Sequence, residues 1–144
     1  ETAGELHDRL SALGAEAIVQ ALSTLDKLTP VPQPEEGVTY AAKLDKSEAK
    51  LDWTVPAPHI DGVIRGFSPF PGAWTMVGGK RVKLLRSRLV EGAGAPGTVL
   101  RDLVVACGQG AVEVTQVQPE GKGPMAADEW LRGARIAPGH VLGE

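Results

Sequence analysis

The sequence predicts a mainly β fold with flanking helices, built as a small Greek-key barrel that follows an N-terminal helical arm. The first observation is composition: the 144 residues include 18 Gly and 11 Pro, which favours short strands and turns over long helices. The second is a series of short apolar segments after residue 72, bounded by glycine and proline. The third is a proline-rich break at residues 29–37, which separates a helical pattern from the rest of the chain.

The helical arm is predicted for residues 1–28. Thr2 and Glu5 form a Thr-x-x-Glu capping box at its start. Gly14 is expected to end a first helix as the residue after its C-cap, so that a second helix occupies the remainder. Apolar residues recur at helical spacing in both helices, at Leu6, Leu10, Leu13, Ile18, Leu22 and Leu25. The arm has few other apolar residues to cover this stripe, so we expect another surface to do so.

A linker is predicted at residues 29–37. Its prolines alternate with other residues at Pro30, Pro32 and Pro34, a pattern that favours an extended and semi-rigid backbone. We expect the barrel domain to span residues 38–144.

Three elements are expected before the central hairpin. Residues 38–44 are predicted to be a short strand. Asp45, with Glu48 three residues later, suits the cap of a short helical turn. The apolar spacing of Ile60, Ile64 and their neighbours predicts a helix over residues 58–67.

A β-hairpin is predicted over residues 73–90. Residues 73–77 and 80–90 both show strand patterns, and Gly78-Gly79 between them suits a tight turn. Alternation in the second strand fails at Leu84-Leu85. A bulge there would bend the strand, as small barrels require.

The remaining elements complete the predicted barrel. Strands are expected at residues 98–100, 103–107 and 111–118, and a closing helix at residues 125–131. Five or six short strands with one interposed helix are typical of a small barrel of the oligonucleotide-binding (OB-fold) type. That architecture recurs among nucleic-acid binders, although a fold alone does not establish a function.

Several functional classes find no support in the residues. The single cysteine, Cys107, excludes an internal disulfide and lies in an apolar segment, which indicates a buried thiol and a reducing compartment. His7, His59 and His140 lack the spaced partners of a metal site. No apolar run reaches the ~20 residues of a membrane span. No nucleophile or phosphate-loop motif is present, so we assign neither catalytic nor metal-binding residues.

Charge is segregated along the chain. The net charge is only −3, which argues against a strong autonomous nucleic-acid binder. Residues 1–60 carry −5 and residues 102–144 carry −3, whereas residues 61–101 carry +5. The candidate contacts with RNA phosphates lie in this basic segment and near the linker, and they are Lys43, Lys46, Lys50, Arg65, Lys80, Arg81, Lys83, Arg86 and Arg88.

Two interpretations of these basic residues stay open. Alternate residues of a strand face opposite sides, so only part of the set can share a face. The first interpretation is a solvated strand whose positive residues guard a sheet edge. In that case the three lysines near the linker, which have the spacing of one helix face, pair partly with Asp45 and Glu48. The second interpretation is a surface that contacts phosphates.

Aromatic residues are expected to fill the core rather than to stack on bases. This expectation rests on apolar neighbours, and only Tyr40 has a setting that suits either role. The five residues expected in the core are Trp53, Phe67, Phe70, Trp74 and Trp130.

Longer motifs resemble a known family. The most specific joins a helix end, a corner with two prolines and a strand start, and it reads Ile64-Arg65-Gly66-Phe67-Ser68-Pro69-Phe70-Pro71-Gly72-Ala73-Trp74. Further matching segments follow in chain order, at residues 39–53, 95–100, 104–110, 117–122, 125 and 130–133. Together they cover nearly the whole chain. The chain resembles the C-terminal domain of methionyl-tRNA formyltransferases, preceded by the linker and the last helices of their N-terminal domain.

The resemblance implies a function that the residues alone do not. Members of that family transfer a formyl group from 10-formyltetrahydrofolate to initiator methionyl-tRNA, using an Asn, a His and an Asp that no position here matches. Their C-terminal domain holds the transfer RNA, and their linker lies where that RNA passes to the active site. Because the chain starts at Glu1 rather than a methionine, we expect it to belong to a longer, monomeric, cytoplasmic enzyme. We expect this part alone to be inactive and to bind no cofactor, with the catalytic domain as its second partner.

Two alternatives to an RNA-binding module stay open. Sugar-nucleotide formyltransferases and formyltetrahydrofolate-hydrolysing enzymes have similar barrels that bind no RNA, and the chain is also similar to those. The chain could instead have a purely structural role, in which the exposed stripe of the arm mediates association.

Overall fold

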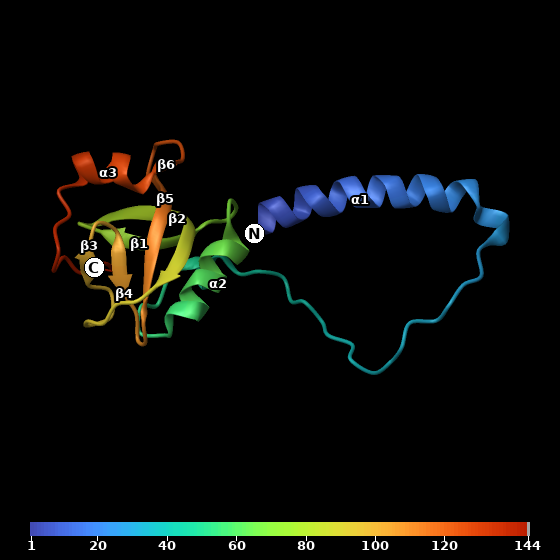
Figure 1. Ribbon diagram of the computed structural model, residues 1–144, viewed down its shortest axis with the longest axis horizontal. Coiled ribbons are helices and arrows are strands. Elements are labelled where there is room, and N and C mark those ends of the chain that lie inside the picture. The colour runs from blue at the N-terminus through green and yellow to red at the C-terminus, as the bar shows by residue number, and fades with distance from the viewer. Residues whose placement is uncertain (144) are drawn as a thin grey trace.

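The computed structural model describes residues 1–143 and consists of a long helix attached to a strand-built body. Helix α1 spans Ala3–Ser23, and its N-terminal end touches the body while the rest extends away from it (Figure 1). Residues 24–45 return from the far end of this helix to the body. The elements that follow α1 are the 3-10 helices η1 (Leu25–Lys27) and η2 (Lys46–Ala49), the helices α2 (Ala57–Phe67) and α3 (Ala127–Ala134), and the strands β1 (Ala73–Val77), β2 (Lys80–Val90), β3 (Val99–Arg101), β4 (Val104–Ala106), β5 (Ala111–Pro119) and β6 (Met125–Ala126).

The strands form one antiparallel sheet in the order β1-β2-β5-β4-β3, with β6 added to β5. The mainly β fold with flanking helices is therefore confirmed. The strand pairs alone do not close the predicted barrel, because among the described residues β1 and β3 are the two ends of this path.

The C-terminal segment, residues 139–143, lies between these two open edges. The Val99 N–H of β3 donates to the carbonyl of His140, and the Leu142 N–H donates to the carbonyl of Gly97, both at 2.8 Å. On the other side, the Gly143 N–H donates to the carbonyl of Met76 in β1 at 2.8 Å. A short irregular segment thus satisfies backbone groups that a closing strand would otherwise pair.

The predicted hairpin is confirmed. Gly78 and Gly79 have φ values of 54° and 74°, which a two-residue turn of the type preferred in hairpins requires of both positions. The pairing of β2 with β5 shifts register between Leu84 and Arg86, which confirms the bulge expected at Leu84-Leu85. Both leucines are buried as a result, and the residues after the bulge change sides.

The core lies between α2 and the sheet. Ile60 and Ile64 of α2 are buried against β2 and β5, and each contributes roughly 1.5–3 kcal/mol through removal from water. The indole N–H of Trp53 donates to the Thr75 hydroxyl at 3.1 Å, so this buried polar pair is satisfied. Cys107 is buried as expected, and desolvation raises the pKa of its thiol to about 11, which makes it unreactive.

The arm differs from the prediction in its continuity. A single helix runs through Gly14, although a mid-helix glycine costs about 1 kcal/mol relative to alanine. The alanine- and leucine-rich neighbours favour the helix and outweigh that cost. The helix end predicted at Gly14 is therefore wrong. The capping box of Thr2 and Glu5 is confirmed. The apolar residues from Leu6 to Leu25 lie exposed along the helix, and no helix among residues 1–143 has the length and hydropathy that crossing a membrane demands.

Two further predictions need correction. Residues 38–44 contain no strand, because no neighbouring strand pairs with them and an isolated extended segment has nothing to stabilise it. The closing helix begins two residues later than expected, since Met125 and Ala126 form β6 instead. The cap of η2 by Asp45 and Glu48 is confirmed.

Candidate nucleic-acid interface

The hairpin places an aromatic ring among basic side chains on one face of the sheet. Trp74 of β1 lies opposite Lys83 of β2 in the register, so the two side chains share a face. The Arg81 guanidinium carbon lies 3.9 Å from the centre of the Trp74 ring, and the Lys50 Nζ lies 5.8 Å from it. We refer to Lys50, Trp74, Arg81 and Lys83 as the Trp74 face. The ring holds Arg81 in place by a cation–π contact.

Backbone contacts fix the geometry of the Trp74 face. The Leu51 N–H donates to the Trp74 carbonyl at 2.9 Å, which brings the neighbouring Lys50 alongside β1. Gly72 has a φ of 84° and leaves room for the stem of Lys83, since an added Cβ would lie 2.7 Å from the Lys83 Cδ. A residue with a side chain at position 72 would therefore push Lys83 off this face.

No cation of the Trp74 face forms an ion pair with a carboxylate within residues 1–143. Its positive charge is therefore available to an external anion. Because the surrounding segments are acidic overall, the positive potential is local to this face.

Three predicted arginines form a separate group. Arg65 pairs with Asp61 at 2.8 Å, Arg88 pairs with Glu113 at 2.7 Å, and Arg86 donates to Glu5 of α1. Together with the first residues of the arm they line a cleft of about 270 Å³. We refer to Arg65, Arg86 and Arg88 as the arginine cleft.

Two ion pairs of the arginine cleft lower the pKa of the carboxylate partner. The hydrogen bond from Arg86, followed by that from the Thr2 backbone, lowers the pKa of Glu5 to about 2. The hydrogen bond from Arg88 likewise lowers the pKa of Glu113. These carboxylates stay ionised at neutral pH, so the arginine cleft offers less charge to an external anion than the Trp74 face does.

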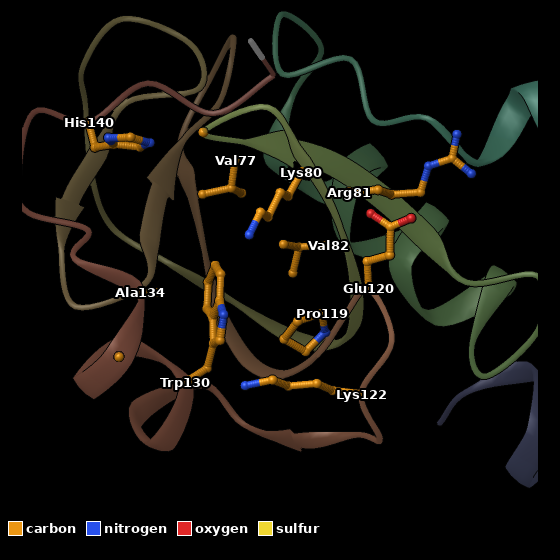
Figure 2. A pocket seen from close by; sticks show the side chains of 12 residues that line it. Val77, Lys80, Arg81, Val82, Pro119, Glu120, Lys122, Trp130, Ala134 and His140 are labelled. Carbon is orange, nitrogen blue, oxygen red and sulfur yellow. The ribbon is translucent and has the colours of Figure 1, made fainter.

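Lys80 lies apart from both groups. Because it alternates with Arg81 along β2, it reaches the other side of the sheet, where it lines a pocket beyond the end of the hairpin. Figure 2 shows its ammonium group directed towards Trp130 of α3, while the Arg81 guanidinium turns away from the pocket centre. The six basic residues predicted between residues 61 and 88 are therefore divided among three places.

The lysines near the linker do not form the helical stripe that their spacing suggested. Lys46 lies in η2, whereas Lys43 precedes that element and Lys50 follows it. The nearby carboxylates are occupied: Asp45 accepts from the Ser47 N–H at 2.7 Å, and Glu48 accepts from the Asp45 N–H at 2.9 Å. The ion pairs expected in the first interpretation are absent among the described residues.

Comparison with known proteins assigns this body to a family. The model of the formyl transferase C-terminal domain matches residues 43–135, about two thirds of the chain. This chain belongs to the formyl transferase C-terminal domain family. The family resemblance read from the sequence is confirmed.

Curated relatives of this family member are named methionyl-tRNA formyltransferase. The protein from Jannaschia sp. (strain CCS1) is 70% identical over 142 residues, which are 99% of this chain and 47% of the relative. The protein from Ruegeria pomeroyi is 61% identical over 143 residues, 99% of this chain and 48% of the relative. The chain thus spans about half the length of the curated relatives it matches.

Solved structures share the formyl transferase C-terminal fold with this chain. A variant of HypX from Aquifex aeolicus superposes with a TM-score of 0.60 at 26% identity, covering 85% of this chain and 25% of that one. HypX in complex with tetrahydrofolic acid superposes with a TM-score of 0.59 at 24% identity, covering 81% and 22%. At these identities the second likeness concerns the fold alone.

The aromatic residues of this family member depart from the sequence prediction. Trp53 and Phe67 are buried in the core as expected. Phe70 is exposed, so its expected core position is wrong, and Tyr40 is exposed as well. Trp74 and Trp130 are only half-buried, and each has basic side chains near it.

Two residues that were not among the predicted RNA contacts lie beside the basic groups. Lys122 lines the hairpin-end pocket with Lys80, and Trp130 forms part of its wall. The sequence gives no usable signal for Lys122, because a single lysine in a turn does not belong to any periodic pattern. Its position follows from the pairing of β5 with β2, which no local signal encodes. Among residues 1–143 no cluster of three or more His, Cys, Asp or Glu side chains suits a metal ion.

Proposed function

We propose that this chain is the transfer-RNA-holding C-terminal portion of a methionyl-tRNA formyltransferase. The whole enzyme would transfer a formyl group from 10-formyltetrahydrofolate to the methionine carried by initiator transfer RNA in the cytoplasm. One observation supports the RNA-holding role most directly: the cations of the Trp74 face have no carboxylate partners within the described residues.

The proposed contact is to phosphates rather than to bases. Lys50, Arg81 and Lys83 offer positive groups on a sheet surface, which suits the evenly spaced charges of an RNA backbone. Binding of this kind releases counterions and weakens steeply as salt rises. A net charge of −3 makes a modest affinity the expected result, because the acidic arm and C-terminal region oppose a long RNA.

In this proposal the catalytic chemistry belongs to the part of the enzyme that this chain does not cover, which is about half the length of the curated relatives. In this proposal residues 1–28 are the last helices of the catalytic domain, residues 29–37 are the linker, and residues 38–144 are the RNA-binding domain. The exposed apolar stripe of α1 supports the first assignment, since it suits packing against a further surface. Lys43 and Lys46 would contact the RNA where it enters the active site. No catalytic residue is assigned within this chain.

A binding measurement tests the RNA-holding role. We expect the 144-residue chain to bind initiator transfer RNA at 50 mM salt and to lose most of that affinity at 300 mM. The Arg81→Ala/Lys83→Ala chain should bind more weakly and show a salt slope smaller by about 2. A control with Lys27→Ala and Arg132→Ala changes the net charge equally but lies on the arm and on α3. Association that does not depend on salt, or equal losses in both variants, would contradict the proposal.

A second candidate function is an accessory barrel in a sugar-nucleotide formyltransferase or a formyltetrahydrofolate hydrolase. The observation in its favour is the arginine cleft, where acidic partners neutralise three of the nine candidate RNA contacts. Full-length enzyme with Lys80→Ala, Arg81→Ala and Lys83→Ala separates the two candidates. Lost activity on transfer RNA with intact folate binding supports the first candidate, whereas unchanged activity on transfer RNA supports the second.

A further inference from the structure

The pocket beyond the end of the β1–β2 hairpin is a second place where this molecule concentrates positive charge beside an aromatic ring. It has a volume of about 400 Å³, within the range of small-ligand sites. Four parts of the chain form its walls: the hairpin, the turn after β5, helix α3 and the C-terminal segment. Such a convergence of distant segments makes a built cavity rather than a groove between two neighbouring strands.

The charge inside this pocket is positive. Lys80 and Lys122 enter from opposite sides, and Figure 2 shows both ammonium groups near the indole of Trp130. Neither lysine has an ion-pair partner among the described residues. The one carboxylate of the wall, Glu120, turns towards Arg81 and away from the pocket centre (Figure 2). An anion entering the pocket would therefore meet two cations.

One residue of the pocket wall, His140, has an unsatisfied polar atom. The Nε2 of His140 is buried and has no hydrogen-bond partner within residues 1–143, which is uncommon because buried polar atoms in folded proteins are almost always paired. An imidazole nitrogen can donate or accept, depending on its tautomer. Because this atom is sealed from solvent, His140 belongs to the wall of the pocket and offers no contact to a ligand.

These features select a ligand with a flat aromatic part and an anionic part. The indole of Trp130 offers a face for stacking, and Lys80 and Lys122 offer contacts to an anion. A nucleotide combines both requirements in one unit, since its base stacks and its phosphate is charged.

We propose that this pocket takes one unpaired nucleotide of the bound RNA. The inference rests on the proposed RNA-holding function and adds a second site to it. The Trp74 face binds the backbone of the paired region, and the hairpin-end pocket receives a nucleotide that is free of the duplex. Arg81 lies between the two, because it contacts Trp74 and also lines the rim of the pocket.

Gly133 provides a variant that fills the pocket and spares the fold. It lies in α3 at the pocket wall, and a Cβ added there meets nothing within 4 Å. Gly133→Leu therefore adds a side chain at the pocket wall whose Cβ meets no other atom, and leucine favours a helix more than glycine does. Gly14→Leu is a matched control, because Gly14 is also helical and has open space around it, but lies on the arm.

The test compares two RNA hairpins of one sequence, one blunt-ended and one with five unpaired nucleotides at its 3′ end. We expect the unpaired tail to improve the dissociation constant of the 144-residue chain about tenfold, as stacking of one base on an aromatic residue does. Gly133→Leu should abolish that gain and leave the blunt hairpin within about twofold. Trp130→Phe should keep most of the gain, and Trp130→Leu should lose it.

The outcomes separate this inference from the proposed function. Binding of both hairpins with equal affinity, or an unchanged gain in Gly133→Leu, overturns the nucleotide pocket alone. Equal losses on both hairpins in Gly133→Leu also overturn it, because the pocket would then not distinguish an unpaired nucleotide. Binding of neither hairpin overturns the RNA-holding function and the pocket with it. Lys80→Ala/Lys122→Ala serves as the second variant, since both lysines are outside the core.

Discussion

The Trp74 face and the arginine cleft contain the same kinds of side chain and differ in what neutralises them. On the Trp74 face, an aromatic ring holds Arg81 in place. The carboxylate of Glu120 turns towards Arg81 (Figure 2), but none of the cations of this face forms an ion pair among the described residues. In the arginine cleft, each guanidinium is paired with an acid from α1, α2 or β5. An aromatic contact positions a cation and leaves its charge in place. A carboxylate also positions the cation, but it neutralises the charge as well.

The comparison shows that counting basic residues along a sequence overstates the charge that a surface offers. Arg86 and Arg88 lie five and seven residues after Arg81 in the same strand. The bulge at Leu84-Leu85 turns them from the core side of the sheet to the outer side, which Arg81 and Lys83 share, and there they pair with Glu5 and Glu113. The positions of the carboxylates thus divide a basic strand into an available half and a neutralised half.

The largest expected effect comes from removing charge from one region at a time. Arg81→Ala/Lys83→Ala should weaken transfer-RNA binding on the order of tenfold at low salt, because two phosphate contacts are lost. Arg86→Ala/Arg88→Ala removes the same charge and should weaken binding by less than about twofold, since its residues are already paired. Titration of labelled transfer RNA with each chain measures the difference. Equal losses would mean that the two regions do not differ in function.

A smaller effect is expected from the ring that organises the Trp74 face. Trp74→Leu removes the cation–π contact with Arg81 and part of the packing of β1, at a cost of about 1–2 kcal/mol in the free energy of unfolding. Trp74→Phe keeps an aromatic ring and should recover most of that cost. Denaturant unfolding of the two variants provides the measurement. A phenylalanine variant as unstable as the leucine variant would show that packing, and not the ring face, stabilises this region.

A modest gain should follow when the arginine cleft is released from its partners. Glu5→Gln/Glu113→Gln removes both carboxylates and keeps side chains of similar size. We expect transfer-RNA affinity at low salt to rise about two- to threefold, because two arginines become available to phosphates. Asp128→Asn/Glu129→Gln, which frees Arg132 on α3 and removes two carboxylates as well, serves as a control for the change in net charge. A gain of the same size in the control would remove the special role of the cleft.

The smallest predicted effect is a change in one titration. Arg86 is the main cause of the lowered pKa of Glu5, which lies at about 2. Arg86→Ala should therefore raise that pKa towards 4.5, although the Thr2 backbone keeps it below that value. Because the folded-state pKa is depressed, the contact stabilises docking of the arm fully above pH 4.5 and is lost as the pH falls towards about 2.

NMR titration of the Glu5 side chain measures this change in pKa. Glu113 is the internal control, since Arg88 rather than Arg86 lowers its pKa. An unchanged titration of Glu5 in the Arg86→Ala chain would show that the arm does not dock on β2 as described.

Elements encoded by neighbouring residues could be predicted from the sequence. The two glycines of the hairpin, the bulge at Leu84-Leu85 and the cap of η2 by Asp45 all depend on residues within a few positions, and all three are confirmed. Helix α2 was predicted within one residue because its apolar face has a regular period.

Features that depend on distant residues could not be predicted. Glu5 and Arg86 lie 81 residues apart, and no local pattern links them. The strand expected at residues 38–44 failed because strand propensity does not supply a pairing partner. The helix end predicted at Gly14 was wrong for the opposite reason, since the helix around this residue is stable enough to include a glycine. The candidate basic residues could therefore be selected from the sequence. Their division into paired and unpaired groups could be seen only in the folded structure.

The C-terminal segment has a consequence for how the molecule is made. The N–H of its last described residue, Gly143, donates to the carbonyl of Met76 in β1. The strand that pairs with β1, β2, is synthesised much earlier. During translation the Met76 carbonyl at the edge of β1 therefore stays unpaired until Gly143 has left the ribosome. Until then this strand edge is open to wrong pairing with another polypeptide.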